Sequence, residues 1–241
     1  LLDGTLVLNA ALFHNQYRDM HAQSFVTACI DETQPETCIA SEFTENGGEI
    51  DATGLEIEFN WLPGENWFVN GSAAFLDSEF GEYNVGRVNG LGNFEGRQDV
   101  TLTTGEIVAA GGVPSLSLAG WTPALNPEFT AAVQVGYEFD LGGSNTLTPV
   151  FQTAYSSEYW SFDFNVPGSE QDAYTKSDLR VIWRNDDRGF EVEAFVENLE
   201  DEAVLTRSVI FTPSQADVPT AAIQANYADP RIWGIRLGAD F

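Results

Sequence analysis

Few residues in this sequence are of types that could perform bond-making chemistry, and their spacing matches no catalytic arrangement. The two histidines, His14 and His21, lie seven positions apart, which is not a paired metal-binding spacing. A hydrolase or acyltransferase would need one of them beside a loop Ser or Asp. We interpret both as surface histidines or as members of an aromatic girdle. The sequence therefore predicts no catalytic residues and no enzyme activity.

Two other segments resemble ligand-binding motifs only in part. Residues 163–168 begin like a calcium loop, but the twelfth position is Tyr174, where a calcium-binding hand needs a bidentate Glu. Looser calcium binding by the acidic loops stays open. Residues 90–96 are rich in Gly but lack the spacing and the following helix of a dinucleotide-binding fingerprint. We predict no metal site and no cofactor.

The only cysteines, Cys29 and Cys38, stand nine positions apart in a polar segment. A zinc site would need more His or Cys ligands nearby, and the sequence offers none there. Two cysteines at this spacing favour a small disulfide loop in an oxidising compartment. We predict a Cys29–Cys38 disulfide.

Composition favours strands and excludes a nucleic-acid partner. The 241 residues include 37 Asp and Glu against 10 Lys and Arg, for a net charge of −27. A nucleic-acid-binding surface needs a basic footprint, which this chain lacks. Its 17 Phe, 7 Tyr, 6 Trp and 22 Gly suit strands better than helices. By itself, the acidity also suits a soluble extracellular or periplasmic protein kept dispersed by charge.

The elements that would position these residues are extended segments in which apolar and polar side chains alternate. The clearest is residues 231–241, where Trp233, Ile235, Leu237 and Phe241 share one face. Its length matches the about 9–11 residues of a tilted strand that crosses a bilayer. The same period-two pattern predicts strands near residues 4–17, 55–61, 67–75, 127–139, 147–156, 178–183, 190–197 and 231–241.

The connections between these eight predicted strands alternate between long and short. The short turns are residues 62–66, 140–145 and 184–189, and the long connections are residues 18–50, 81–126, 157–175 and 199–229. Outer-membrane β-barrels have short periplasmic turns and long outer loops, whereas soluble sandwiches show no such rule. We therefore predict an all-β, antiparallel transmembrane β-barrel rather than a soluble sandwich.

The side chains on the two faces fit this interpretation. Large aromatic residues gather beside the short turns, where a girdle would meet the inner membrane interface: Trp61, Trp67, Tyr137, Phe139, Trp183 and Phe190. Acidic residues on the opposite faces are expected to line a wet lumen: Glu56, Glu58, Glu191, Glu193 and Glu197.

The chain resembles the carboxy-terminal part of the TonB-dependent outer-membrane receptors. The resemblance is carried by residues 4–13, 53–61 and 70–80, by the Asn-Leu segment at residues 194–202, and by the strand ending in Phe241. Each motif is degenerate, but their order and spacing agree with the family over nearly the whole chain.

The resemblance implies a barrel of about 22 strands, plugged by an amino-terminal domain. Residues 1–241 would be its last eight strands, with the plug and the TonB-binding segment absent. It implies localisation in the bacterial outer membrane, contact with its lipid, and TonB as partner. The solute would be a scarce, bulky small molecule or glycan, such as a ferric siderophore, haem, cobalamin or an oligosaccharide. The solute would touch the expected ligand-binding loops, residues 18–50, 81–126 and 199–229, and lumen-facing side chains near their bases. The terminal strand would serve barrel assembly.

Two alternatives stay open at this point. The chain could be a complete eight-stranded outer-membrane barrel that acts as an anchor, adhesin or narrow pore. It could also be a secreted β-sandwich that binds glycans through its aromatic residues.

Overall fold

The computed structural model describes residues 1–29, 38–86, 115–163, 165, 168–211 and 222–239. Its elements, in chain order, are η1 (Leu2–Gly4), β1 (Leu6–Cys29), β2 (Cys38–Gly64), β3 (Trp67–Gly86), β4 (Ser115–Ser117), β5 (Phe129–Tyr137), β6 (Phe139–Gly142), β7 (Asn145–Ser156), β8 (Tyr159–Trp160), β9 (Glu170–Gln171), β10 (Tyr174–Asn185), β11 (Phe190–Glu197), β12 (Leu205–Phe211), β13 (Ala222–Tyr227) and β14 (Ile232–Ala239). The helices found in these ranges are too short or too polar to cross a membrane.

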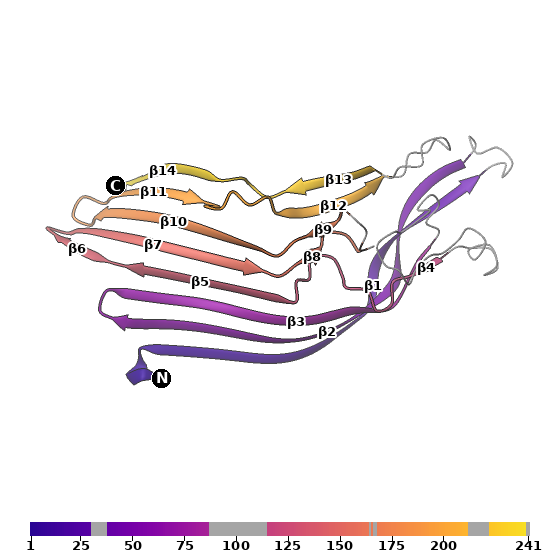
Figure 1. Ribbon diagram of the computed structural model, residues 1–241, viewed down its shortest axis with the longest axis horizontal. Coiled ribbons are helices and arrows are strands. Elements are labelled where there is room, and N and C mark those ends of the chain that lie inside the picture. The colour runs from indigo at the N-terminus through magenta and orange to yellow at the C-terminus, as the bar shows by residue number, and fades with distance from the viewer. Residues whose placement is uncertain (30–37, 87–114, 164, 166–167, 212–221, 240–241) are drawn as a thin grey trace.

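Eight long strands form one antiparallel sheet in the order β1-β2-β3-β5-β7-β10-β11-β14. Each strand pairs with the next long strand along the chain, which confirms the eight predicted strands and the all-β fold. Figure 1 shows the tight connections at the end of the sheet that also carries the N-terminus. The long connections leave from the opposite end, which we call the outer end. The predicted alternation of short turns and long connections is therefore confirmed.

The prediction that residues 18–50 form a loop was wrong for most of its length. β1 and β2 continue beyond the sheet as a paired two-stranded arm, with Phe25 opposite Glu42 and Cys29 opposite Cys38 (Figure 1). Outside the membrane both faces of such an arm meet water, so its sequence need not alternate between apolar and polar residues. The loop prediction rested on the loss of that alternation. Residues 30–37 lie outside the described part.

The other long connections also contain strands. In the predicted loop 81–126, β3 runs on to Gly86 and pairs with β4, while residues 87–114 lie outside the described part. In the predicted loop 199–229, β12 and β13 form a hairpin of their own. The connection between β7 and β10 holds the short pair β8 and β9. Backbone pairing thus continues past the membrane-spanning sheet.

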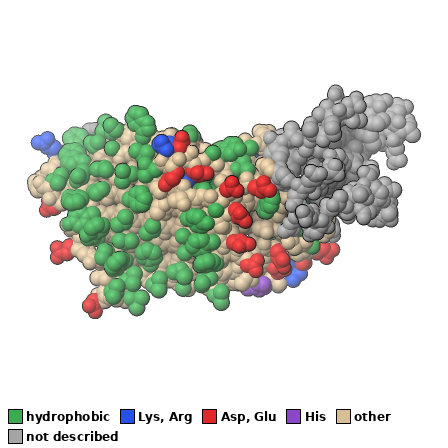
Figure 2. Space-filling model, in the orientation of Figure 1, with side chains coloured by type: hydrophobic (Ala, Val, Ile, Leu, Met, Phe, Trp, Pro, Cys, Tyr) green, Lys and Arg blue, Asp and Glu red, His purple; other side chains and the backbone are tan. Residues whose placement is uncertain are grey.

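One face of the sheet, the outward face, is apolar across neighbouring strands. A typical row joins Leu8 to Phe59, Phe59 to Gly71, and Gly71 to Val133. Leu12 and Trp233 on this face are 81% and 79% exposed. Figure 2 shows hydrophobic side chains covering the sheet, with acidic side chains gathered beside them toward the outer end. An apolar surface of this extent suits contact with lipid hydrocarbon.

Aromatic side chains border the apolar band at both ends. Near the tight turns, the rings of Trp67 and Tyr137 lie 4.8 Å apart, centroid to centroid. Near the outer end, the Phe75 and Phe129 rings lie 4.5 Å apart, and Tyr155 continues this row. The strand from Trp67 to Phe75 rises about 26 Å at roughly 3.3 Å per residue. This length agrees with the about 25 Å apolar band of outer-membrane barrels.

The buried apolar side chains lie mainly beyond the band, where the outer connections fold together. Phe80 and Tyr83 at the end of β3 pack ring to ring, 4.9 Å apart, beside the buried Leu118 and Trp121. A single-layer sheet between lipid and lumen has no second layer to pack against. Its compact core therefore forms only where chain segments stack outside the membrane.

The sandwich and small-barrel alternatives differ from the observed sheet. A sandwich needs two packed sheets, whereas all eight long strands here belong to one. In the described residues, β1 and β14 stand at opposite ends of the strand order and are not paired with each other. The sheet is therefore an open segment of wall and not a closed eight-stranded barrel.

Candidate ligand-binding face

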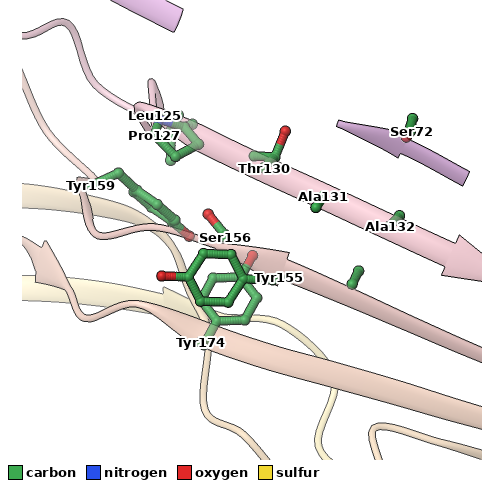
Figure 3. Close-up of a pocket in the computed structure, with 11 residues that line it drawn as sticks. Ser72, Leu125, Pro127, Thr130, Ala131, Ala132, Tyr155, Ser156, Tyr159 and Tyr174 are labelled. Carbon is green, nitrogen blue, oxygen red and sulfur yellow. The ribbon is translucent and has the colours of Figure 1, made fainter. Parts of the chain in front are cut away.

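The inner face of the sheet, opposite the lipid-facing side chains, carries a shallow hollow near its outer end. Its volume is about 380 Å³. Figure 3 shows β5, β7 and β10 supplying much of its lining, with Tyr159 at one side. The lining consists of Ser72, Leu125, Pro127, Thr130, Ala131, Ala132, Ala154, Tyr155, Ser156, Tyr159 and Tyr174.

The hollow exists because small side chains occupy paired positions on adjacent strands. Ser72 on β3 pairs with Ala132 on β5, and Ala132 pairs with Ala154 on β7. One row closer to the outer end, Thr130 pairs with Ser156. These side chains leave a depression bounded on the β10 side by the ring of Tyr174, which pairs with Ser156.

A row of side-chain amides borders the hollow on the side of the tight turns. Asn60 pairs with Asn70, Asn70 with Gln134, and Gln134 with Gln152, so that four neighbouring strands each contribute one amide. We call these four residues the carboxamide row. Every carboxamide can donate two hydrogen bonds and accept two, so the row can bind oxygen- and nitrogen-bearing groups without any charge.

Charged residues flank the hollow and the carboxamide row. On the β2 side, Glu56 pairs with Ala74 and Glu58 pairs with Ser72. On the β10 side, Lys176 pairs with Ala154, and Asp178 pairs with Gln152. The nearest charged positions in these rows are thus three carboxylates and one ammonium. This balance makes the local charge around the hollow negative.

The outer connections hold the rim of the hollow in place through hydrogen bonds. The Tyr159 hydroxyl donates to the main-chain oxygen of Leu205 at 2.8 Å, and Leu125 N donates to Trp160 O at 2.7 Å. Burial and then the electrostatic effect of Tyr174 raise the pKa of Tyr159 to about 12. Tyr159 is therefore an uncharged hydrogen-bonding group at neutral pH.

Ion pairs occupy a separate part of the inner face, on β10, β11 and β14. Arg236 Nη1 lies 2.9 Å from Glu193 Oε1, and Arg236 Nη2 lies 3.3 Å from Glu197 Oε1. Arg184 Nε donates to Glu191 Oε2 at 3.1 Å. The register confirms that the five glutamates predicted to line the lumen lie on the inner face. Three of the five, Glu191, Glu193 and Glu197, have arginine partners. Two of the arginines on this face are thus engaged away from the hollow.

His14 and Asp163 make structural contacts in the described chain. His14 faces outward just above the apolar band, where its Nδ1 lies 2.9 Å from Thr53 Oγ1. Asp163 Oδ1 accepts a hydrogen bond of 2.8 Å from Ala124 N and so ties two outer connections together. In the described residues no three His, Cys, Asp or Glu side chains are grouped as a metal site would need. The Gly-rich residues 90–96 lie outside the described part.

The predicted disulfide and terminal strand are described in part. The register places Cys29 opposite Cys38, but their side chains lie outside the described part, and the side chains that are described include no disulfide. β14 pairs with β11 so that Val196 lies opposite Trp233, and Val192 opposite Leu237. Phe241 lies outside the described part. The disulfide and the assembly role of this strand stay predictions.

The sequence predicted ligand contacts from the long loops and from lumen-facing side chains near their bases, but it did not identify the residues of the hollow or the carboxamide row. Their residues are spread over β2, β3, β5, β7 and β10 and become neighbours only through the register of the sheet. The one signal in the sequence was the run of small and amide residues on the polar faces of the predicted strands.

A sheet with lipid on one face, a polar lumen on the other and long connections at one end is the wall of an outer-membrane β-barrel. Residues 1–199 match the family described as TonB dependent receptor-like, beta-barrel. The chain belongs to this family, and its place is the bacterial outer membrane.

Solved structures of similar fold include three receptors. They are the ferric yersiniabactin uptake receptor FyuA from Yersinia pestis (TM-score 0.63, 19% identity, 99% of this chain, 28% of that chain), the siderophore receptor PiuA from Acinetobacter baumannii (0.58, 18%, 99%, 26%), and the ferripyoverdine receptor of Pseudomonas aeruginosa (0.54, 16%, 100%, 25%). At these identities the likeness shows the fold alone. This chain spans 25–28% of the length of these three receptors. No curated protein gave a significant match.

Proposed function

We propose that the protein to which this chain belongs is an active-transport receptor that takes up a scarce, bulky solute across the outer membrane. Solutes of this kind include ferric siderophores, haem, cobalamin and oligosaccharides. TonB would supply the energy through a plug and a TonB-binding segment elsewhere in the full protein. Residues 1–241 would form about a third of the barrel wall and several of its outer connections.

The observation that carries the proposal is the hollow on the inner face, directly beneath the outer connections. Its volume of about 380 Å³ lies within the range of roughly 300–1,000 Å³ for small-molecule sites. It is formed by one part of a barrel wall, so the remaining strands and the plug would complete a larger chamber. A solute arriving from outside would meet the outer connections first and this hollow next.

Ligand contacts are proposed for the outer connections and for the face below them. The connections are the arm of β1 and β2, the segment between β3 and β5, and the hairpin of β12 and β13. Side chains at the hollow are hydroxyls, rings and methyl groups, which bind a solute without reacting with it. We therefore also propose that the protein is not an enzyme.

Two structural roles belong to the same proposal. A Cys29–Cys38 disulfide would staple the end of the arm, and the register that places these residues opposite each other supports it. Directly opposed residues in antiparallel strands have Cα atoms roughly 4.5–5.5 Å apart, which suits a disulfide. The terminal strand, with Trp233, Ile235, Leu237 and Phe241, would guide assembly of the barrel. Its apolar outward face supports that role.

Solute depletion by living cells tests the transport function without a guess at the solute. Cells with the full-length receptor and cells deleted for it would be grown in the same medium, and the spent media compared by mass spectrometry. We expect a solute that only receptor-bearing cells remove. Removal should stop when the proton-motive force is dissipated, because TonB depends on it. Identical spent media, across conditions in which the receptor is expressed, would contradict the proposal.

A further inference from the structure

We propose that the hollow and the carboxamide row form a binding surface for an uncharged solute rich in hydrogen-bonding oxygen atoms, and that they discriminate against polyanions. This inference rests on the proposed receptor function and specifies the chemistry of its solute. A neutral ferric hydroxamate complex and a neutral oligosaccharide share this chemistry. A ferric catecholate complex, which carries several negative charges, does not.

The hydrogen-bonding groups of this surface are uncharged and can both donate and accept. Asn70, Gln134 and Gln152 in the carboxamide row are only partly exposed, so their amides lie in a defined strip and not at flexible tips. Ser72 and Thr130 add hydroxyls at the hollow. Amides and hydroxyls match ligand hydroxyl, carbonyl and amide groups, since each such pair is satisfied without desolvating a charge.

The shape of the surface supports a ligand that lies against the wall. Ala132 and Ala154 present only methyl groups, so a ligand can approach the sheet closely between the carboxamide row and Tyr174. The half-buried rings of Tyr159 and Tyr174 both line the hollow and suit contact with the C–H faces of a neutral, oxygen-rich ligand. A hollow of this kind binds through close contact and many weak hydrogen bonds rather than through one ion pair.

The surrounding charges oppose an anion. Glu56, Glu58 and Asp178 flank the surface, against Lys176, and the whole chain carries a net charge of −27. Arg180 lies one row nearer the tight turns, and Arg184 and Arg236 are paired with Glu191, Glu193 and Glu197. None of the described side chains that form the hollow or the carboxamide row is an arginine, the residue best suited to hold an anion in two parallel hydrogen bonds.

Calorimetric titration of the purified full-length receptor in detergent would test the inference. The probes are a neutral ferric trihydroxamate, a ferric tricatecholate of charge −3 and maltoheptaose. We expect one of the two neutral probes to bind at least about tenfold more tightly than the trianion, because like charges at a binding surface disfavour association. The two neutral probes separate an iron chelate from a glycan as the source of the ligand.

Two variants and one matched control locate the binding. Ala154→Trp fills the hollow and should weaken the neutral probe by about tenfold or more, since the ligand would clash with the indole. Ala194→Trp is the matched control, because Ala194 lies on the outward face opposite Ile235 and a tryptophan there meets lipid. Heat-modifiable gel migration checks that both variants fold. Gln134→Leu with Gln152→Leu should weaken binding while leaving the hollow open.

Each result has a defined meaning. Equal or tighter binding of the trianion, wild-type affinity in Ala154→Trp, or no binding of any probe would overturn the inference. None of these results would contradict the proposed transport function, because that function is tested separately by the depletion of a solute from the medium. A receptor that removes only a polyanionic solute from the medium would refute this inference and leave the proposed function standing.

Discussion

Asn198 Nδ2 donates a hydrogen bond of 3.3 Å to the main-chain oxygen of Asp229, 31 positions along the chain. The same side-chain amide makes two hydrogen bonds to the main chain of Glu202. Its Nδ2 donates to Glu202 O, and its Oδ1 accepts from Glu202 N. Its side chain is 1% exposed, and its φ of 58° lies in the left-handed region that Asn tolerates better than most residues. The Asn-Leu segment that resembled the family therefore joins the end of β11 to the chain entering β14.

Substitution Asn198→Ala should destabilise the receptor by roughly 2–4 kcal/mol, because it leaves buried donors and acceptors without partners. The measurement is the temperature at which the folded band of the full-length receptor is lost on an unboiled gel. Asn226→Ala, at an exposed position of β13, is the matched control and should change it little. Equal melting of the two variants would show that the Asn198 amide contributes no stability.

Gly136→Ala should impair barrel assembly, because a Cβ there would overlap the ring of Phe68 on the neighbouring strand. Overpacking of this kind costs about 1–3 kcal/mol. Phe68→Ala in the same chain removes the overlap, so the double variant should assemble better than Gly136→Ala alone. Gly238→Ala is the control, since its Cβ would meet Glu191 Cβ at an ordinary 3.5 Å. Assembly yield in the outer membrane is the readout, and equal yields for the two glycine variants would refute the overlap.

Acidic pH should tighten the outer connection between residues 118 and 128. Burial raises the pKa of Asp163, although the hydrogen bond from Ala124 N lowers it in part. A raised folded-state pKa contributes stability that is present below the unfolded value of 3.8 and is lost as the pH rises through the folded value. Amide-exchange protection at Ala124 should therefore fall as the pH rises from below 4 toward neutral.

Asp163→Asn should remove this pH dependence while keeping an oxygen that accepts the bond from Ala124 N. Protection at Ala124 in the variant would then be flat across the same pH range, after correction for intrinsic exchange rates. A variant that keeps the wild-type pH profile would assign the effect to another group.

The exported full-length receptor should contain a Cys29–Cys38 disulfide, because the register places the two residues directly opposite each other. Peptide mapping without reduction should recover the linked pair. Cys29→Ser with Cys38→Ser should make the arm more sensitive to protease, since a loop of this size is stabilised by roughly 2–3 kcal/mol when closed. Two alkylatable thiols in the unreduced protein would exclude the bridge.

The membrane-spanning part of the fold was predictable from the sequence because two solvents act on it. Lipid and lumen water impose alternation on each strand, so Leu55 to Trp61 and Trp233 to Leu237 could be assigned to faces residue by residue. The arm could not be assigned in this way, because both of its faces lie outside lipid. Adjacent apolar residues such as Phe25 and Val26 are therefore tolerated there, and the period-two pattern is lost. Alternation of apolar and polar residues reveals which face a side chain takes only where the two faces of a strand meet different solvents. Where both faces meet water, the sequence pattern gives little information about the fold.

The sequence by itself determined the eight long strands of the sheet, the tight turns, the outward face and the family to which the chain belongs. Only the tertiary structure decided that Ser72, Ala132 and Ala154 share one row and that Asn60, Asn70, Gln134 and Gln152 form the next. The physical reason is register. Alternation fixes which face a side chain takes, whereas its neighbour on the adjacent strand depends on turn length and backbone pairing, and a two-residue slip would preserve every face and disperse the hollow.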